Sequence, residues 1–218
     1  MAPYSAPPSI TRWGIALPLA ATTALLALGL LVAAYPALPA WDSALLLGLH
    51  QYATPALNRA IALFTDLGTV WGVLPATLGL AAIALWHRRW LVASYWIGAL
   101  AGSIVLNPAA KALWQRVRPA LWEGVPPQSD FSFPSGHATY SMTFVLALVL
   151  LSWASPNRYW IAGLGSVFVL FIGASRVYLG VHYPSDILGG WLLAIAWAVG
   201  LHQAIFHWGP RLRSRLER

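Results

Sequence analysis

Three short blocks of polar residues stand out in an otherwise apolar chain of 218 residues, of which only 9% are charged. They contain three cations, two imidazoles, one carboxylate and two small residues. The members are Lys111 and Arg118 in the first block, Ser135, Gly136 and His137 in the second, and Arg176, His182 and Asp186 in the third. Cations can neutralise phosphoryl oxygens, and imidazoles can attack or move protons. These residue types therefore predict the breaking of a phosphate ester.

The first block places Lys111 and Arg118 seven residues apart, which is two helical turns. We expect them to share one helix face if the helix continues to Pro119, which would end it. A charge at the bilayer centre costs about 2.5–3.5 kcal/mol or more, so Lys111 should lie near the end of a span and face a polar cavity. Taken alone, Lys111 could equally be a snorkelling interfacial lysine.

The second block, Pro134-Ser135-Gly136-His137, precedes a long apolar run. Proline is favoured at the first position of a helix, which predicts that Pro134 opens one. The Ser135 and Gly136 amides and the serine hydroxyl would then be free to hold an anion at the helix N-terminus. The alternative is an ordinary helix start with an interfacial histidine.

The third block ends one apolar span at Ser175-Arg176 and begins the next at Pro184. Asp186, in the first turn of that next helix, can reach back to orient His182. The alternative is an Arg176–Asp186 ion pair that closes a helical hairpin.

The composition predicts an all-α integral membrane protein. The chain is 59% hydrophobic, with a mean hydropathy of +0.65, whereas soluble domains are about 45–50% apolar. A spanning helix needs about 20 apolar residues, and a short helix over 41–51 should lie at the interface. We predict a bundle of six transmembrane helices over 13–34, 60–86, 90–114, 136–154, 159–179 and 185–207. The first stretch is 22 residues long, longer than the apolar region of a cleaved signal peptide.

Basic residues predict the orientation of these spans. With the N-terminus in the cytoplasm, eight cations fall on the cytoplasmic side and five on the opposite side, three of which belong to the blocks. The positive-inside rule therefore predicts that both termini are cytoplasmic. All three blocks then lie together at the outer ends of the spans.

Several classes of function do not fit the sequence. The net charge of +7 is spread over span flanks and the C-terminal tail, without the basic stripe expected of a nucleic-acid-binding protein. The chain has no cysteine, which excludes disulfides and thiolate chemistry. We expect no cofactor and no metal, because paired acids near the blocks are limited to Glu123 and Asp130 in a loop.

Together the blocks resemble the three-part signature of the type 2 phosphatidic acid phosphatase family, which is similar to vanadium haloperoxidases. The signature is Lys, six residues, Arg-Pro; Pro-Ser-Gly-His; and Ser-Arg, five residues, His, three residues, Asp. It is matched without departure over residues 111–186. The resemblance implies that His182 is the nucleophile that forms a phosphohistidine, that His137 is the acid and then the base, and that Asp186 orients His182. Phosphate binding by Lys111, Arg118, Ser135, Gly136 and Arg176 is also implied.

We therefore expect one membrane-embedded phosphatase domain over residues 1–218 in a bacterial cytoplasmic membrane, with its site facing outward. The resemblance implies phosphatidylglycerophosphate, phosphatidic acid or undecaprenyl diphosphate as substrate, and we favour the last. A lipid-to-lipid phosphotransferase with the same site, a soluble-type haloperoxidase, a transporter and a structural membrane protein are the alternatives. The bilayer and its lipids are the expected partners, and nothing in the sequence predicts an oligomeric state.

Overall fold

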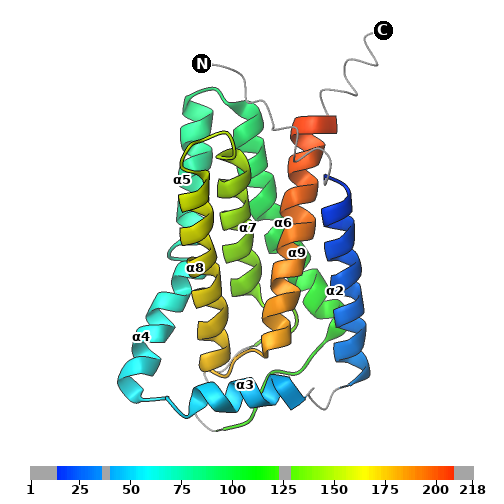
Figure 1. Cartoon of the computed structure of the whole chain (residues 1–218), viewed down its shortest axis with the longest axis vertical. Coiled ribbons are helices and arrows are strands. Elements are labelled where there is room, and N and C mark those ends of the chain that lie inside the picture. Colours follow the sequence, from blue (N-terminus) through cyan, green and yellow to red (C-terminus); the bar gives the residue numbers. More distant parts are fainter. Residues whose placement is uncertain (1–13, 36–39, 123–128, 209–218) are drawn as a thin grey trace.

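The computed structural model describes residues 14–35, 40–122 and 129–208, and over these residues the protein is a helical bundle without strands (Figure 1). This confirms the all-α prediction. The longer helices are α2 (Ala16–Ala34), α5 (Val73–Trp86), α6 (Trp90–Trp114), α7 (Gly136–Leu151), α8 (Arg158–Tyr178) and α9 (Pro184–Gln203). The shorter ones are α3 (Ala40–His50), α4 (Pro55–Thr65), the 3-10 turn η1 (Asp66–Gly68) and the π-helical end η2 (Ala204–Trp208).

Among the residues that the structure describes, five helical stretches are long and apolar enough to cross a membrane, so the protein is a multi-pass membrane protein. They are α2, the segment Pro55–Trp86, α6, α8 and the segment Pro184–His207. The remaining predicted span, 136–154, is the shorter α7 of 16 residues. The count of six spans therefore stays a prediction. Many large apolar side chains remain on the outside of the bundle, Leu30 at 69% exposure among them, as contact with lipid requires.

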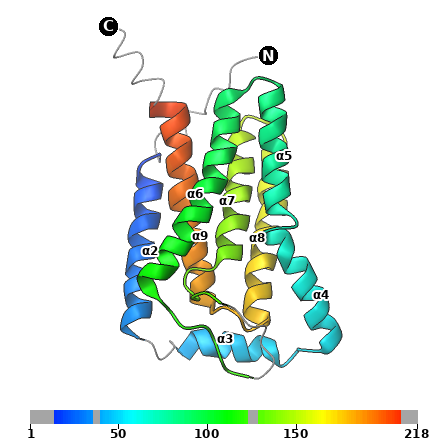
Figure 2. The ribbon, with the colours of Figure 1, turned by 180° about the vertical axis from the view of Figure 1, so that it is seen from behind.

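Helices α7 and α9 form the centre of the bundle. Helix α9 packs against α7 and α2, and α7 also packs against α6 and α8 (Figures 1 and 2). A Cβ atom added at Gly190 would lie 2.7 Å from the carbonyl oxygen of Ser135 and 2.9 Å from the Cβ of Ala138. Only glycine permits this close approach. It brings the start of α9 against the start of α7, and with them the second and third blocks.

The predicted interfacial helix exists as α3, which lies across the lower end of the bundle, while α4 slants away from it (Figure 1). The predicted second span is broken at η1, where the chain turns from α4 toward α5. The hydroxyl of Thr65 at the end of α4 lies 2.6 Å from that of Ser175 on α8. This contact holds the break against the helix that carries Arg176.

Candidate active site

The first block is not carried on one helix face, and that prediction was wrong. Helix α6 ends at Trp114, because Gln115 adopts the left-handed conformation (φ 48°, ψ 34°), and the chain then runs without regular secondary structure to Arg118. The side chains of Arg116 and Arg118 are only 8% and 14% exposed, whereas Val117 between them is 78% exposed. Arg116 and Arg118 therefore both point inward.

Lys111 and Arg118 meet at one carboxylate, that of Asp130. The Lys111 Nζ donates to Asp130 Oδ2 at 2.6 Å, and the Arg118 Nη2 donates to Oδ1 at 2.5 Å. Burial raises the pKa of Asp130, but the hydrogen bonds from the two cations outweigh it and lower the pKa to about 2. Asp130 is therefore ionised at neutral pH, and it occupies the two cations that were expected to hold phosphate.

The second block begins α7, but the helix starts at Gly136, two residues after the predicted start at Pro134. Ser135 is the N-cap, so Pro134 lies before the helix and not at its first position. Asn107 of α6 donates to the carbonyl oxygen of Pro134 at 3.2 Å and fixes this turn. The Ser135 amide is not free, because it donates to the carbonyl oxygen of Asp186 at 3.0 Å. Its hydroxyl is buried and has no hydrogen-bond partner among the described residues.

The third block brings His182 and Asp186 into contact. Pro184 opens α9 as predicted, and Asp186 in its first turn faces the Nδ1 of His182 through Oδ2 at 3.3 Å. The same oxygen accepts from the Tyr183 amide at 2.9 Å and from the hydroxyl of Ser132. Gly180, at φ +70°, makes the turn between α8 and His182. The carboxylate is thus fixed where it can orient the imidazole.

The second nitrogen of His182 faces a cation. Its Nε2 lies 3.2 Å from the Nη1 of Arg118, which also donates to the carbonyl oxygen of Val181 at 2.7 Å. Burial lowers the pKa of His182, and the hydrogen bond with Asp186 offsets only part of this, so the pKa is about 4. The ring is neutral at pH 7, with Nδ1 committed to Asp186 and Nε2 directed at Arg118.

His137 and Arg176 complete the cluster. The Nε2 of His137 is buried, has no hydrogen-bond partner within the described part of the chain, and lies 3.6 Å from Asp66 Oδ1 of η1. Arg176 is 6% exposed, and its Nε also has no hydrogen-bond partner among the described residues. Both Arg176 and His182 are electrostatic neighbours of His137. The Arg176–Asp186 ion pair considered from sequence is not formed, because Asp186 pairs instead with Arg116.

All eight predicted site residues therefore gather at one end of the bundle, around buried polar atoms that have no hydrogen-bond partner in the ranges that the structure describes. Comparison with known proteins decides the family, because residues 90–210 match the PAP2 superfamily. The chain belongs to the PAP2 superfamily. The resemblance seen in the sequence signature is confirmed.

Relatives of this PAP2 protein are named as lipid phosphatases. An undecaprenyl-diphosphatase of Sulfolobus acidocaldarius is 31% identical over 76% of this chain and 77% of its own length. The phosphatidylglycerophosphatase B of Bacillus subtilis is 30% identical over 65% of this chain and 71% of its own. A crystal structure of a transmembrane PAP2-type phosphatidylglycerolphosphate phosphatase from Bacillus subtilis superposes with a TM-score of 0.71, 25% identity and coverage of 90% and 97%.

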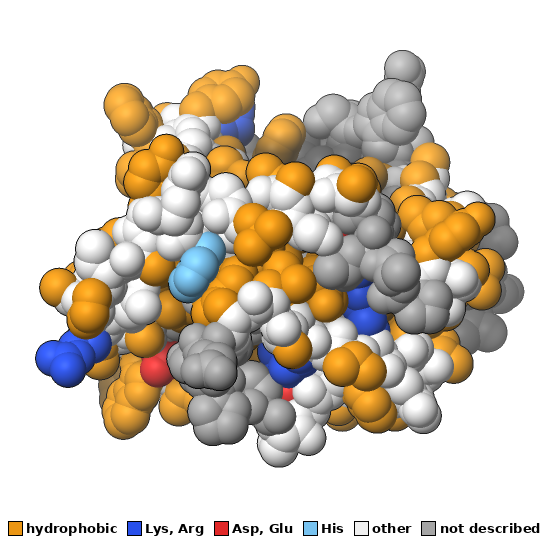
Figure 3. All heavy atoms as spheres, turned by 90° about the horizontal axis from the view of Figure 1, so that it is seen from below, with side chains coloured by type: hydrophobic (Ala, Val, Ile, Leu, Met, Phe, Trp, Pro, Cys, Tyr) orange, Lys and Arg blue, Asp and Glu red, His pale blue; other side chains and the backbone are white. Residues whose placement is uncertain are grey.

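The face of this PAP2 protein that carries the site is mixed in character. Seen from below, cationic side chains lie among hydrophobic ones over the end of the bundle (Figure 3). The described residues include no group of three or more His, Asp or Glu side chains arranged to hold a metal ion. The expectation that this PAP2 protein needs no metal stays a prediction.

Sequence reasoning missed five side chains, four that contact the predicted residues and one, Asp42, that reaches Asp186 through Arg116. They are Asp42, Asp66, Arg116, Asp130 and Ser132. None belongs to the signature of the PAP2 superfamily as matched here. For Asp42, Asp66 and Asp130 the available signal was charge, since acids are so few in this chain that each one inside a helix or beside a block needs a partner.

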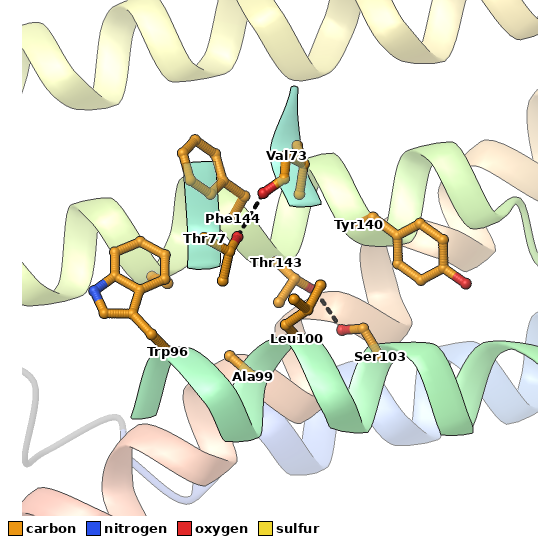
Figure 4. A pocket seen from close by; sticks show the side chains of 10 residues that line it. Val73, Thr77, Trp96, Ala99, Leu100, Ser103, Tyr140, Thr143 and Phe144 are labelled. Carbon is orange, nitrogen blue, oxygen red and sulfur yellow. Dashed lines mark hydrogen bonds between the residues drawn. The ribbon is translucent and has the colours of Figure 1, made fainter. Parts of the chain in front are cut away.

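A pocket lies between α5, α6 and α7, farther into the bundle than the site (Figure 4). It has an empty volume of about 210 Å³, including space that opens to the surroundings. Apolar side chains such as Trp96 and Phe144 line it together with a bonded Ser103–Thr143 pair at 2.9 Å. Tyr140 of the same lining is one helical turn from His137 on α7. The pocket therefore adjoins the side of α7 that carries the site.

Proposed function

We propose that this PAP2 protein hydrolyses the terminal phosphate of a membrane lipid phosphate or diphosphate through a phosphohistidine on His182. The observation that carries the proposal is the state of that imidazole. Its Nδ1 faces Asp186 Oδ2 at 3.3 Å, and its Nε2 faces Arg118 at 3.2 Å. A neutral ring held in this way presents one nitrogen to a phosphorus atom beside a cation.

Five groups would hold the phosphoryl oxygens. Lys111, Arg118 and Arg176 supply positive charge, and the Ser135 hydroxyl and Gly136 amide supply hydrogen bonds. The partnerless state of the Ser135 hydroxyl and of the Arg176 Nε supports this, because buried donors usually have acceptors. Positioning and neutralising the phosphoryl oxygens are the main contributions of a protein to phosphoryl transfer.

In the first step, the lone pair of His182 Nε2 forms a bond to phosphorus. The bond between phosphorus and the lipid oxygen breaks, and that oxygen takes a proton from His137. Asp186 accepts the Nδ1 hydrogen throughout and stabilises the positive charge that the substituted ring acquires. The Asp66 carboxylate lies 3.6 Å from His137 Nε2, close enough to pair with the ring once it carries the proton.

In the second step, water attacks the phosphorus and the bond to His182 Nε2 breaks. His137, now neutral, accepts the proton that the water loses. Inorganic phosphate leaves, and both imidazoles return to their starting protonation states. The cycle therefore requires a different starting protonation state of each histidine, neutral for His182 and cationic for His137.

The lipid nature of the substrate follows from the surroundings of the site. The cluster lies at the end of a membrane bundle, so a lipid can bring its phosphate to the cations while its tail stays in the apolar region. We favour a polyprenyl diphosphate, which is in keeping with the name of the Sulfolobus acidocaldarius relative.

We further propose that the site faces outward from a bacterial cytoplasmic membrane. The start of α2 and the end of α9 lie at the end of the bundle opposite α3 and the site (Figure 1). The positive-inside count puts that opposite end in the cytoplasm. Part of this count, Arg12 and the four tail arginines, lies outside the described residues.

Release of inorganic phosphate from a lipid panel tests the proposal. The panel contains a polyprenyl diphosphate, phosphatidylglycerophosphate and phosphatidic acid in detergent micelles with EDTA, and the His182→Ala protein is the matched control. We expect phosphate release by the wild-type protein alone, fastest from the diphosphate. Transfer of the phosphate to a second lipid, without release of inorganic phosphate, would indicate the phosphotransferase, and neither release nor transfer from any lipid would reject the enzyme.

Asp130 competes with the substrate, so we expect Asp130→Asn to bind inorganic phosphate at least about tenfold more tightly. Removing the carboxylate frees Lys111 and Arg118 and takes away a charge that repels the phosphate. Charges about 4 Å apart interact by roughly 1–4 kcal/mol near a protein surface, and 1.4 kcal/mol is a factor of about ten. The inhibition constant of inorganic phosphate measures the effect.

Asp130→Glu keeps the charge and is the matched control for this measurement. Its inhibition constant should stay close to that of the wild-type protein. Weaker phosphate binding by Asp130→Asn would show instead that Asp130 remains in place and orients the two cations.

The pKa of His182 gives a separate prediction that needs no substrate. Because burial lowers this pKa from 6.5 to about 4, the ring should stay neutral as the pH falls through 6.5 and gain its proton only near 4. NMR of the histidine ring nitrogens measures the midpoint, and the signal missing from His182→Ala assigns it. A midpoint at or above 6.5 would contradict the buried, neutral nucleophile.

A further inference from the structure

Asp42 is a fully buried carboxylate on the interfacial helix α3. Its Oδ1 accepts from the Ser185 amide at 2.9 Å, and its Oδ2 accepts from the Ser185 hydroxyl and from Arg116 Nη2, the latter at 2.9 Å. A buried charge is tolerated only with such partners. These bonds fasten α3 to the first turn of α9, next to Asp186.

Arg116 joins this carboxylate to the one beside His182. Its Nη2 binds Asp42, while its Nη1 donates at 2.6 Å to Asp186 Oδ1 and at 2.6 Å to the Ser185 hydroxyl. The guanidinium also stacks over the ring of Tyr183, 4.1 Å from its centroid, and its side chain is only 8% exposed. Planar donors of this kind hold two acceptors in a fixed geometry that an ammonium group does not reproduce.

The two carboxylate oxygens of Asp186 therefore bind different side chains. Oδ1 is held by Arg116, and Oδ2 faces Nδ1 of His182. A carboxylate bound on both sides cannot turn away from the imidazole. Arg116 is also the one cation that pairs with Asp186 within the part of the chain that the structure describes.

We propose that Arg116, anchored by Asp42, is a positioning residue that keeps Asp186 ionised and oriented toward His182. The inference rests on the proposed function, in which His182 is the nucleophile. Through Asp42, helix α3 then forms part of the active site, although Asp42 lies 69 positions before Lys111 in the sequence. Arg116 itself lies within the first block but is not one of its signature residues.

The charges around Arg116 explain the expected effect of replacing it. Without the guanidinium, two buried carboxylates remain with no cation between them, and like charges in one buried site cannot both stay ionised. A proton on Asp186 removes its ability to accept from Nδ1, so His182 shifts toward the tautomer that carries its hydrogen on Nε2. That tautomer has no lone pair on Nε2 with which to attack phosphorus.

The test compares Arg116→Lys, Arg116→Gln and Asp42→Asn with the matched controls Arg59→Lys and Arg59→Gln, which change an exposed cation of α4. We expect kcat to fall about 10–100-fold in Arg116→Lys and Asp42→Asn, the range for residues that orient a catalytic group. Arg116→Gln should lose up to about 10⁴-fold, as when a catalytic carboxylate no longer fixes its histidine. KM should change little, and the controls should match the wild-type protein.

Two further measurements separate positioning from folding. Ring-nitrogen NMR should show the His182 hydrogen on Nδ1 in the wild-type protein and partly on Nε2 in Arg116→Gln. Thermal shift with orthovanadate, a phosphate analogue, should show that Arg116→Lys is folded and still binds an anion.

An unchanged kcat and an unchanged tautomer in all three variants would overturn the inference. A fall in kcat that follows thermal stability alone, with the tautomer unchanged, would overturn it as well. If the wild-type protein releases no phosphate from any lipid, the proposed function fails, and the His182 tautomer in Arg116→Gln still decides the role of Arg116.

Discussion

Replacing His182 by alanine should lower kcat by at least about 10⁴-fold, the scale of loss when the nucleophile of a coupled catalytic group is removed. The imidazole is 2% exposed, and both of its nitrogens are engaged, by Asp186 and by Arg118. The remaining groups could still bind the phosphate but would have no atom to accept it. Phosphate release from the preferred lipid measures the loss, and binding of inorganic phosphate should persist.

His87→Ala is the matched control, because His87 is exposed and follows α5 at the far end of the bundle. It should keep the activity of the wild-type protein. If His182→Ala kept kcat within about tenfold of the wild-type value, a barrier difference below about 1.4 kcal/mol, His182 could not be the nucleophile.

Replacing His137 by glutamine should have an effect that depends on the leaving group. General acid catalysis contributes roughly 10²–10⁴-fold, and the oxygen of an aliphatic alcohol needs the proton far more than that of a nitrophenol. We therefore expect kcat for phosphatidic acid to fall by roughly that factor, while phosphoenzyme formation from p-nitrophenyl phosphate is much less affected. Initial burst and steady-state rates on the two substrates measure the difference.

Asp66, which lies beside His137, allows a second test of this role of His137. Asp66→Asn removes the carboxylate 3.6 Å from His137 Nε2 and should lower the same rates in the same order, by a smaller factor. Equal losses on both substrates in His137→Gln would mean that His137 holds the phosphate and does not protonate the leaving oxygen.

Much of the fold could be predicted because the bilayer imposes simple rules. Apolar stretches of about 20 residues must form helices there, and the predicted spans coincide with α2, α6, α8 and α9 within a few residues. The break at Asp66 was visible as polar residues inside an apolar run. The end of α6 was not visible in the sequence, because it depends on the left-handed conformation of Gln115, and glutamine has no strong preference for that conformation.

The gathering of the signature residues could also be expected, since each block lies at the same end of a predicted span. The residues that contact the signature residues could not be expected from the sequence. Asp130 contacts Lys111 from 19 positions away, and Asp42 reaches Ser185 from 143 positions away. Such contacts depend on how α3 and two loops pack around the bundle end, and no local pattern encodes that packing. The predictions that rest on them, for Asp130 and Arg116, come from the structure alone.

Trapping the covalent intermediate on His182 tests the proposed mechanism most directly. The protein is mixed with a polyprenyl diphosphate radiolabelled in its terminal phosphate, quenched within the first turnover, and digested to locate the label. We predict an acid-labile, alkali-stable label on His182 that accumulates further in His137→Gln and is absent from His182→Ala. A label on another residue, or one that survives in His182→Ala, would show that His182 is not the nucleophile.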